Sequence, residues 1–303
     1  MANNELKAPF PYFGGKGKVA GAIWDRFGDV QRYIEPFCGS AATLLARPAW
    51  HTGKTEIIND ENGFIVNVYR AIAADAEQVW SYCDYPVTQL DMKARHAWLQ
   101  TQRDRLRALL LSDPEACDYK IAGWWLWGAG AAWGSQWMRK SMTEMPSFSL
   151  PSGIHADNGG VALLRRLQAR LRKVKIINGD WKRVVTDMLV TDESPTAVLL
   201  DPPYLTHDRE VRVYESLNDE APARDSYAWA VDAARRFPTL RIAYCSYRGH
   251  FDPPDGWSEF RWTTNGGYAN TSADGRGRNN KEREVIWFSP GCLSGEVQMS
   301  LGL

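Results

Sequence analysis

The chain has 303 residues, zero formal net charge, 44% hydrophobic and 24% charged residues, a composition ordinary for a globular protein with a sizeable core. No apolar run reaches the roughly 18 residues that span a bilayer, and the N-terminus lacks the layout of a signal peptide, so we expect a cytoplasmic protein with no membrane contact. The five cysteines are scattered and form no C-x-x-C, which argues against a zinc ribbon or a disulfide framework. The histidines lack ligand spacing, and no metal is expected.

The first part of the chain alternates strand and helix. A strand is expected over 31–35, a turn over 36–40 that contains Gly39, and then a helix to residue 46. This order places backbone donors at a helix N-terminus, where anionic groups bind. A second strand, 54–60, ends on Asp60, which is where nucleoside-binding α/β folds hold ribose hydroxyls.

The middle of the chain is helical, basic and rich in tryptophan. Residues 93–183 hold 16 Lys and Arg against 7 Asp and Glu, and six of the 14 tryptophans lie between Trp98 and Trp137. A basic lobe inside an acidic host fits contact with a polyanion, although a solvated helical face explains the same charges. Most of the rings are expected in a core, with Trp137, Arg139 and Lys140 as candidate nucleic-acid contacts.

The α/β alternation resumes after residue 160. Strands are expected over 173–178, 196–200, 240–246, 257–263 and 284–289. Between the last two lies a glycine- and arginine-rich segment, and its Arg276 and Arg278 are further candidate DNA contacts.

The most informative residues are Asp201-Pro202-Pro203-Tyr204, directly after the apolar strand 196–200. Open α/β sheets bind ligands at the carboxyl ends of their strands. Two prolines remove two backbone donors, so the turn offers a carboxylate, an outward carbonyl and a flat ring. Such a turn suits methyl transfer to a planar amino group, and the alternative is a strand-ending turn with an incidental aspartate.

Five motifs in this order resemble those of Dam-type DNA adenine methyltransferases of the α group. They are Pro11-Tyr12-Phe13-Gly14-Gly15-Lys16, Glu35-Pro36-Phe37-Cys38-Gly39-Ser40, Asn59-Asp60-Glu61-Asn62, Gly179-Asp180-Trp181 and Asp201-Pro202-Pro203-Tyr204. The resemblance implies a Rossmann-like α/β sheet that uses S-adenosylmethionine, with a mainly helical target-recognition insert. The expected parts are a first catalytic segment over 1–84, the insert over 85–172 and a second catalytic segment over 173–303.

The resemblance also implies roles for these positions. Asp201, Pro202, Pro203 and Tyr204 match the catalytic motif, Asp60 the acid on the ribose, and Asp180 and Trp181 the residues beside the cofactor's adenine. The remaining cofactor-binding residues implied are Tyr12, Lys16, Glu35, Phe37, Gly39, Ser40 and again Asp201. The glycine turn departs from the family pattern at Ala41, where a second glycine is usual.

The implied reaction is transfer of a methyl group from S-adenosylmethionine to the N6 amine of an adenine flipped out of double-stranded DNA. Adenine in RNA, an amide amine on protein, and a DNA-binding protein without activity remain as alternatives. A monomer or weak dimer of bacterial or phage origin is expected. Whether a cognate restriction endonuclease accompanies it is left open.

Overall fold

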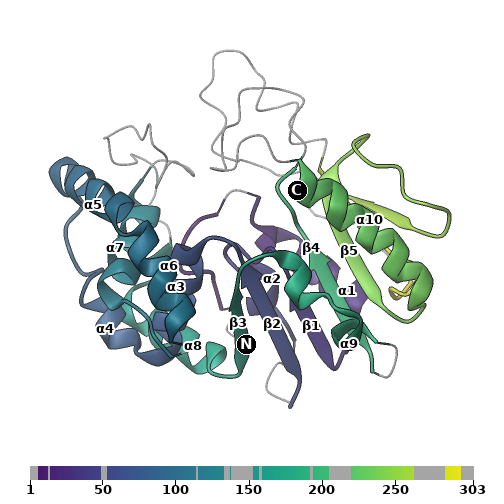
Figure 1. Cartoon of the computed structure of the whole chain (residues 1–303), viewed down its shortest axis with the longest axis horizontal. Helices are drawn as coiled ribbons and strands as arrows, with labels where there is room; N and C mark the ends of the chain where they lie inside the picture. Colours follow the sequence, from purple (N-terminus) through teal and green to yellow (C-terminus); the bar gives the residue numbers. More distant parts are fainter. Residues whose placement is uncertain are drawn as a thin grey trace, which may run out of the picture.

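A computed structural model describes residues 6–12, 14–48, 53–113, 115–132, 137, 153–156, 159–191, 194–204, 220–262 and 284–294. They form a seven-stranded sheet in the order β3-β2-β1-β4-β5-β7-β6 (Figure 1). Its parallel strands are β1 (Arg32–Glu35), β2 (Thr55–Asp60), β3 (Val174–Asn178), β4 (Thr196–Leu200) and β5 (Arg241–Tyr247). The last strand, β7 (Glu284–Phe288), runs antiparallel between β5 and β6 (Ser258–Arg261). The predicted strands and the α/β class are confirmed.

The two faces of the sheet are covered by different helices because successive strand side chains point to opposite sides. Ile58 and Leu199 belong to the core beneath α1 (Ala20–Phe27), α2 (Ala42–Leu45) and α3 (Gly63–Ala74). Their neighbours Ile57 and Val198 belong to the opposite core, which includes side chains of η4 (Trp181–Val184), α9 (Asp187–Val190) and α10 (Ala221–Arg236). Apolar residues on both sides make these strands continuous hydrophobic runs, as buried parallel strands require.

Beside β3 lies a helical lobe, seen at the left of Figure 1. It comprises α4 (Ala76–Trp80), α5 (Gln89–Thr101), α6 (Arg103–Ser112), α7 (Tyr119–Ala131) and α8 (Gly160–Leu171), with the short helix η3 (Gly153–His155). Helix α3 contacts β2 and β3 on one side and α6, α7 and α8 on the other, so it joins the lobe to the sheet. Trp125 and Trp127 are buried in α7, which confirms that the aromatic run supplies core rings.

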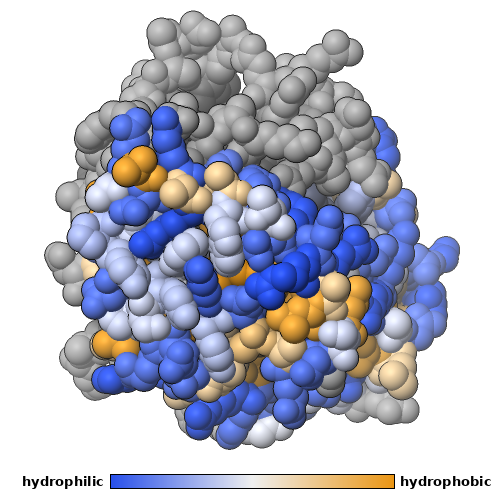
Figure 2. All heavy atoms as spheres, turned by 60° about the vertical axis from the view of Figure 1, so that its left-hand side comes forward, coloured by the Kyte–Doolittle hydropathy of each residue, from blue (hydrophilic) through white to orange (hydrophobic). Residues whose placement is uncertain are grey.

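The outer face of the lobe is mixed in character. In Figure 2 hydrophilic side chains surround smaller apolar patches. Leu90 and Leu111 are exposed on α5 and α6. None of the described helices is long and apolar enough to cross a membrane.

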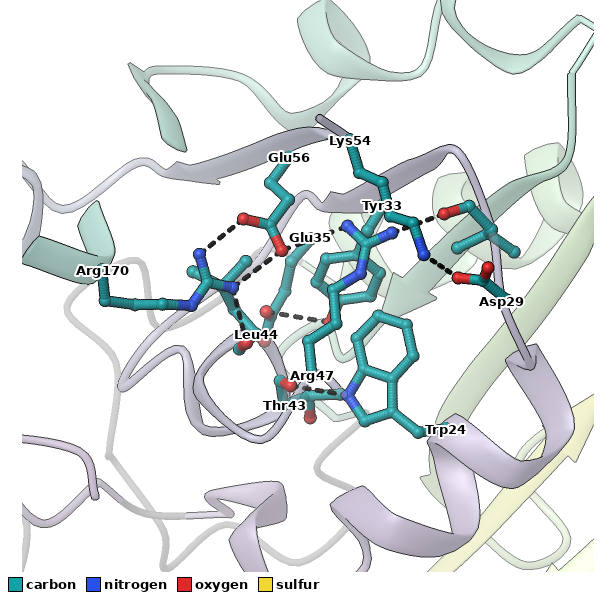
Figure 3. A network of polar contacts seen from close by, with 11 residues as sticks. Trp24, Asp29, Tyr33, Glu35, Thr43, Leu44, Arg47, Lys54, Glu56 and Arg170 are labelled. Carbon is teal, nitrogen blue, oxygen red and sulfur yellow. Dashed lines mark hydrogen bonds and ion pairs between the residues drawn. The ribbon is translucent and has the colours of Figure 1, made fainter. Parts of the chain in front are cut away.

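A buried ion network connects the lobe to the sheet (Figure 3). The Glu56 carboxylate on β2 accepts hydrogen bonds from Arg170 of α8 at 2.5 and 2.7 Å, and from Arg47 at 3.1 Å. All three side chains are at most 3% exposed. Arg170 also donates to the Leu44 carbonyl, and Trp24 donates to the Thr43 carbonyl. These side chains satisfy carbonyls at the end of the four-residue helix α2, which has too few residues to stabilise itself.

Candidate functional site

The predicted motifs meet at the carboxyl edge of the parallel strands. The Gly39 backbone N–H donates to the Asp60 carboxylate at 2.9 Å, which joins the turn after β1 to the end of β2. The Asn59 side-chain amide donates to the carbonyls of Pro36 and Gly179, both at 2.9 Å. The turns after β1, β2 and β3 are therefore hydrogen-bonded to one another.

The turn after β1 requires close approach of the backbone to Tyr12. Gly39 has φ of +45°, and a Cβ placed there would lie 2.4 Å from the Tyr12 ring. Two residues later, Ala41 adopts the left-handed conformation with φ of 49°. This conformation costs an L-residue about 1–2 kcal/mol, which explains why a glycine is usual at this position.

Glu35 lies buried beneath this turn. Its carboxylate accepts hydrogen bonds from the Tyr33 hydroxyl at 2.9 Å and from the Leu44 backbone N–H, so it fixes the start of α2. Burial raises the pKa of Glu35 to about 8, opposed by the Tyr33 hydrogen bond. Burial likewise raises the pKa of Asp60 to about 6, against the hydrogen bonds from the backbone of Asn62 and Gly39.

The Asp201 carboxylate is held by two side chains, one distant in the sequence and one three residues away. The Lys16 ammonium in η1 (Lys16–Lys18) donates to both of its oxygens, at 2.7 and 2.8 Å, and to the Gly14 carbonyl at 2.7 Å. The Tyr204 hydroxyl donates to Oδ1 at 3.1 Å. A carboxylate has about four acceptor positions, so these three bonds leave one position, on Oδ2.

Lys16 is buried, with 4% of its surface exposed. Burial alone lowers the pKa of its ammonium, but Asp201 and the nearby Cys245 and Glu284 outweigh this and hold the pKa above its usual value. The lysine therefore remains charged and keeps the Asp201 carboxylate oriented.

The aromatic and the carbonyl of the predicted motif are both placed at the site. The Tyr204 ring is half-buried and meets Tyr247 edge to face, with ring centroids 4.7 Å apart. Lys16 lies 5.4 Å from the Tyr204 ring centroid. No backbone N–H in the described part of the chain donates to the Pro202 carbonyl.

Beyond β3, the residues expected at the cofactor's adenine have different exposures. Asp180 is exposed, and its side chain caps η4 by accepting from the Lys182 N–H at 2.8 Å. Trp181 is only 6% exposed and packs against Phe37 and Trp229, with centroids 5.9 and 6.2 Å away. Phe37 is the more accessible of the paired rings, while Trp181 supports it from within the core.

The candidate DNA contacts are less fully placed. Trp137 is 7% exposed, close to His96, Trp127 and Gly128, so its ring lies inside the lobe. A buried ring cannot stack on a base, which makes Trp137 a supporting residue in this conformation. The four candidate basic residues, Arg139, Lys140, Arg276 and Arg278, lie outside the described residues.

Sequence reasoning missed three residues of the site: Tyr33, Tyr247 and Glu284. Tyr33 could have been found from strand alternation, because it precedes Glu35 by two positions and shares its side of β1. Tyr247 and Glu284 are paired across β5 and β7. No local signal reveals that pairing.

The strand order and the linked turns form a mixed α/β sheet that is consistent with an S-adenosylmethionine-dependent methyltransferase fold. Residues 12–109 match the model of the D12 class N6 adenine-specific DNA methyltransferase family. The match begins at Tyr12 and ends within α6. The match over residues 12–109 confirms the family resemblance predicted from the motifs. A comparison with curated proteins gave no match.

This family implies an adenine-specific DNA methyltransferase, EC 2.1.1.72, with DNA as substrate and S-adenosylmethionine as methyl donor. The matched segment ends before Asp201. Among the described residues, no group of three or more His, Cys, Asp or Glu side chains could hold a metal ion.

Proposed function

We propose that this protein transfers a methyl group from S-adenosylmethionine to the N6 amine of an adenine flipped out of double-stranded DNA. The observation that carries the proposal is the Asp201 carboxylate. It stands at the end of β4, fixed by Lys16 and Tyr204, with one acceptor position left on Oδ2.

The residues around the turn after β1 suit the cofactor. Gly39 permits the close approach of Tyr12, and Ser40 and Phe37 belong to the same turn. Asp60 accepts backbone hydrogen bonds on both carboxylate oxygens and has further acceptor capacity for ribose hydroxyls.

Tyr12, Lys16, Glu35, Phe37, Gly39 and Ser40 would form the wall of the cofactor site. Asp180 would lie near the cofactor's adenine, with Trp181 behind Phe37 on that side. When bound, this cofactor supplies the electrophilic methyl group.

Asp201 and Pro202 would activate the amine. The lone pair of an aryl amine is delocalised into its ring, so the nitrogen is a poor nucleophile. Hydrogen bonds from the two amine protons to Asp201 Oδ2 and the Pro202 carbonyl pyramidalise the nitrogen and localise its lone pair. The methylated nitrogen releases one proton, for which the Asp201 carboxylate is the adjacent acceptor. Fixing both reactants in line supplies much of the rate acceleration.

Tyr204 would hold the flipped base. Its ring is supported from the side by Tyr247, and base–aromatic stacking is worth about 1–3 kcal/mol. Its hydroxyl fixes Asp201 at the same time, so one side chain positions the base and the acceptor. This double role requires the base to leave the duplex, because a stacked base cannot reach a half-buried ring.

The helical lobe would contact DNA with cations beside aromatic rings. Lys120 of α7 lies 4.7 and 4.4 Å from the ring centroids of Trp98 and Trp124. Arg139 and Lys140 follow this aromatic run in the sequence. We expect Arg139→Ala to weaken DNA binding and to reduce the salt dependence of the association constant, measured by titration at several salt concentrations. An unchanged salt slope removes Arg139 from the interface.

The activity is tested by long-read sequencing of DNA from methylation-deficient cells that express the chain. Asp201→Ala is the inactive variant. The second Asp-Pro-Pro of the chain provides a matched control, because Asp252 is exposed in a turn outside the site. Modified adenines in one short sequence are expected for the wild type and Asp252→Ala and absent for Asp201→Ala.

If adenines stay unmodified while the soluble protein binds S-adenosylmethionine, the DNA assignment is wrong, and adenine in RNA becomes the next substrate to assay. A protein that binds DNA but not the cofactor is instead a binding protein without activity.

A further inference from the structure

Glu284 is the first residue of β7 and faces the Lys16 side of the sheet. Because β7 is antiparallel to β5, its beginning lies at the carboxyl edge of the parallel strands, and Glu284 pairs with Tyr247. Strand alternation places Glu284 on the same face as Ile286 and Phe288, which belong to the core beneath α1. The carboxyl group therefore lies on the face that carries Lys16, two strands from Asp201.

This carboxyl group is held close to charges without a direct bond to them. Its Oε2 atom is buried and has no hydrogen-bond partner among the residues that the structure describes. The three Lys16 N–H groups are taken by Gly14 and Asp201. Burial raises the pKa of Glu284, Lys16 opposes the rise, and Asp201 adds to it.

The surroundings of Lys16 contain more acidic than basic groups. Glu35, Asp201 and Glu284 all interact electrostatically with this one ammonium. Among these three described acidic residues, Asp201 is the one that forms an ion pair with Lys16. A ligand that brings one further positive charge into this site is attracted by the Glu284 carboxylate and relieves the repulsion between Glu284 and Asp201.

We propose that Glu284 is a specificity determinant that favours the positively charged methyl donor over its neutral thioether product. S-adenosylmethionine carries a sulfonium in addition to its zwitterionic amino-acid group, and S-adenosylhomocysteine lacks that charge. The inference rests on the proposed cofactor and concerns binding, so it holds whether the methylated base is in DNA or RNA.

Calorimetry with each of the two compounds tests the proposal on the full chain. Unit charges about 10 Å apart at an effective dielectric constant of about 20 change an affinity by about tenfold. We expect Glu284→Gln to lower the affinity for S-adenosylmethionine by about tenfold and the affinity for S-adenosylhomocysteine by less than about twofold. Glu284→Asp keeps the charge and should keep the wild-type preference.

The matched control is Glu259→Gln, because Glu259 lies on the adjacent strand β6 and pairs with Arg261. It should alter neither affinity. If Glu284→Gln changes both affinities equally, or neither, Glu284 does not discriminate between the ligands and the inference is wrong. If the wild type binds neither compound, the cofactor assignment itself fails. If Glu284→Gln does not fold, the ratio of the two affinities is measured for the wild type and for Glu284→Asp at several salt concentrations. A wild-type affinity ratio near one that does not change with salt contradicts the proposal.

Discussion

Replacing Glu56 by glutamine should destabilise the protein more than any surface substitution. The wild-type carboxylate receives three hydrogen bonds from Arg47 and Arg170, and the three side chains are at most 3% exposed. Glutamine keeps the shape but removes the carboxylate charge that faces both buried guanidinium groups. Its amide nitrogen also presents a donor to at least one guanidinium N–H, because Oε1 accepts from Arg47 and Arg170 and Oε2 accepts from Arg170.

Removing one partner of a buried ion pair costs about 3–5 kcal/mol. Arg170 also donates to the Leu44 carbonyl and Arg47 to the Val30 carbonyl, and a neutral carbonyl does not replace the charge of the carboxylate. We therefore expect the free energy of unfolding to fall by about 3–5 kcal/mol. For a chain of this size, this lowers Tm by on the order of 10 °C.

Urea unfolding monitored by tryptophan fluorescence measures this change, with Glu77→Gln as the matched control. Glu77 also pairs with an arginine of α8, Arg165, but both side chains are more than half exposed. Exposed pairs contribute roughly 0–1 kcal/mol, so the control should stay close to wild type. A Glu56→Gln shift below about 1 kcal/mol, or one equal to that of the control, would show that burial does not make this network important.

Three further substitutions test the site. Gly39→Ala should weaken S-adenosylmethionine binding at least about tenfold, because the added Cβ would lie 2.4 Å from the Tyr12 ring. The control Gly21→Ala, on open helix surface, should stabilise α1 by about 0.5–1 kcal/mol. Equal cofactor affinities of the two variants by calorimetry would contradict the role of Gly39. Tyr204→Phe keeps the stacking ring but removes the hydrogen bond to the Asp201 carboxylate, which is worth about 1.5–3 kcal/mol. We expect kcat to fall at least about tenfold with cofactor affinity unchanged. An unaltered kcat would show that the hydroxyl has no part in the mechanism. The pKa of Glu35 is raised to about 8, so the folded state resists its ionisation and stability should decline as pH rises from about 5 to about 8. Glu35→Gln should flatten that decline in thermal unfolding scans, and an equally steep decline would assign it to other groups.

The sequence predicted the strands closely because their signals are local. The buried strand 196–200 and the strand 284–289 were expected within one residue of β4 and β7, since apolar runs bounded by turn residues specify them. The unusual residue at position 41 was also visible in the sequence. That Ala41 adopts a left-handed conformation became apparent only from its backbone angle of 49°.

By itself, the sequence determined the α/β alternation, the turn residues at each strand end and the family whose motifs these turns resemble. Those features depend on residues a few positions apart. Only the tertiary structure decided that Lys16 donates hydrogen bonds to Asp201, that Glu284 interacts electrostatically with the same lysine and that Trp181 lies in a core. The Lys16–Asp201 bond joins residues 185 positions apart, and the position of Glu284 follows from strand order and register. Side-chain alternation fixes the face of each residue along its own strand, but only the assembled sheet determines which strands are neighbours.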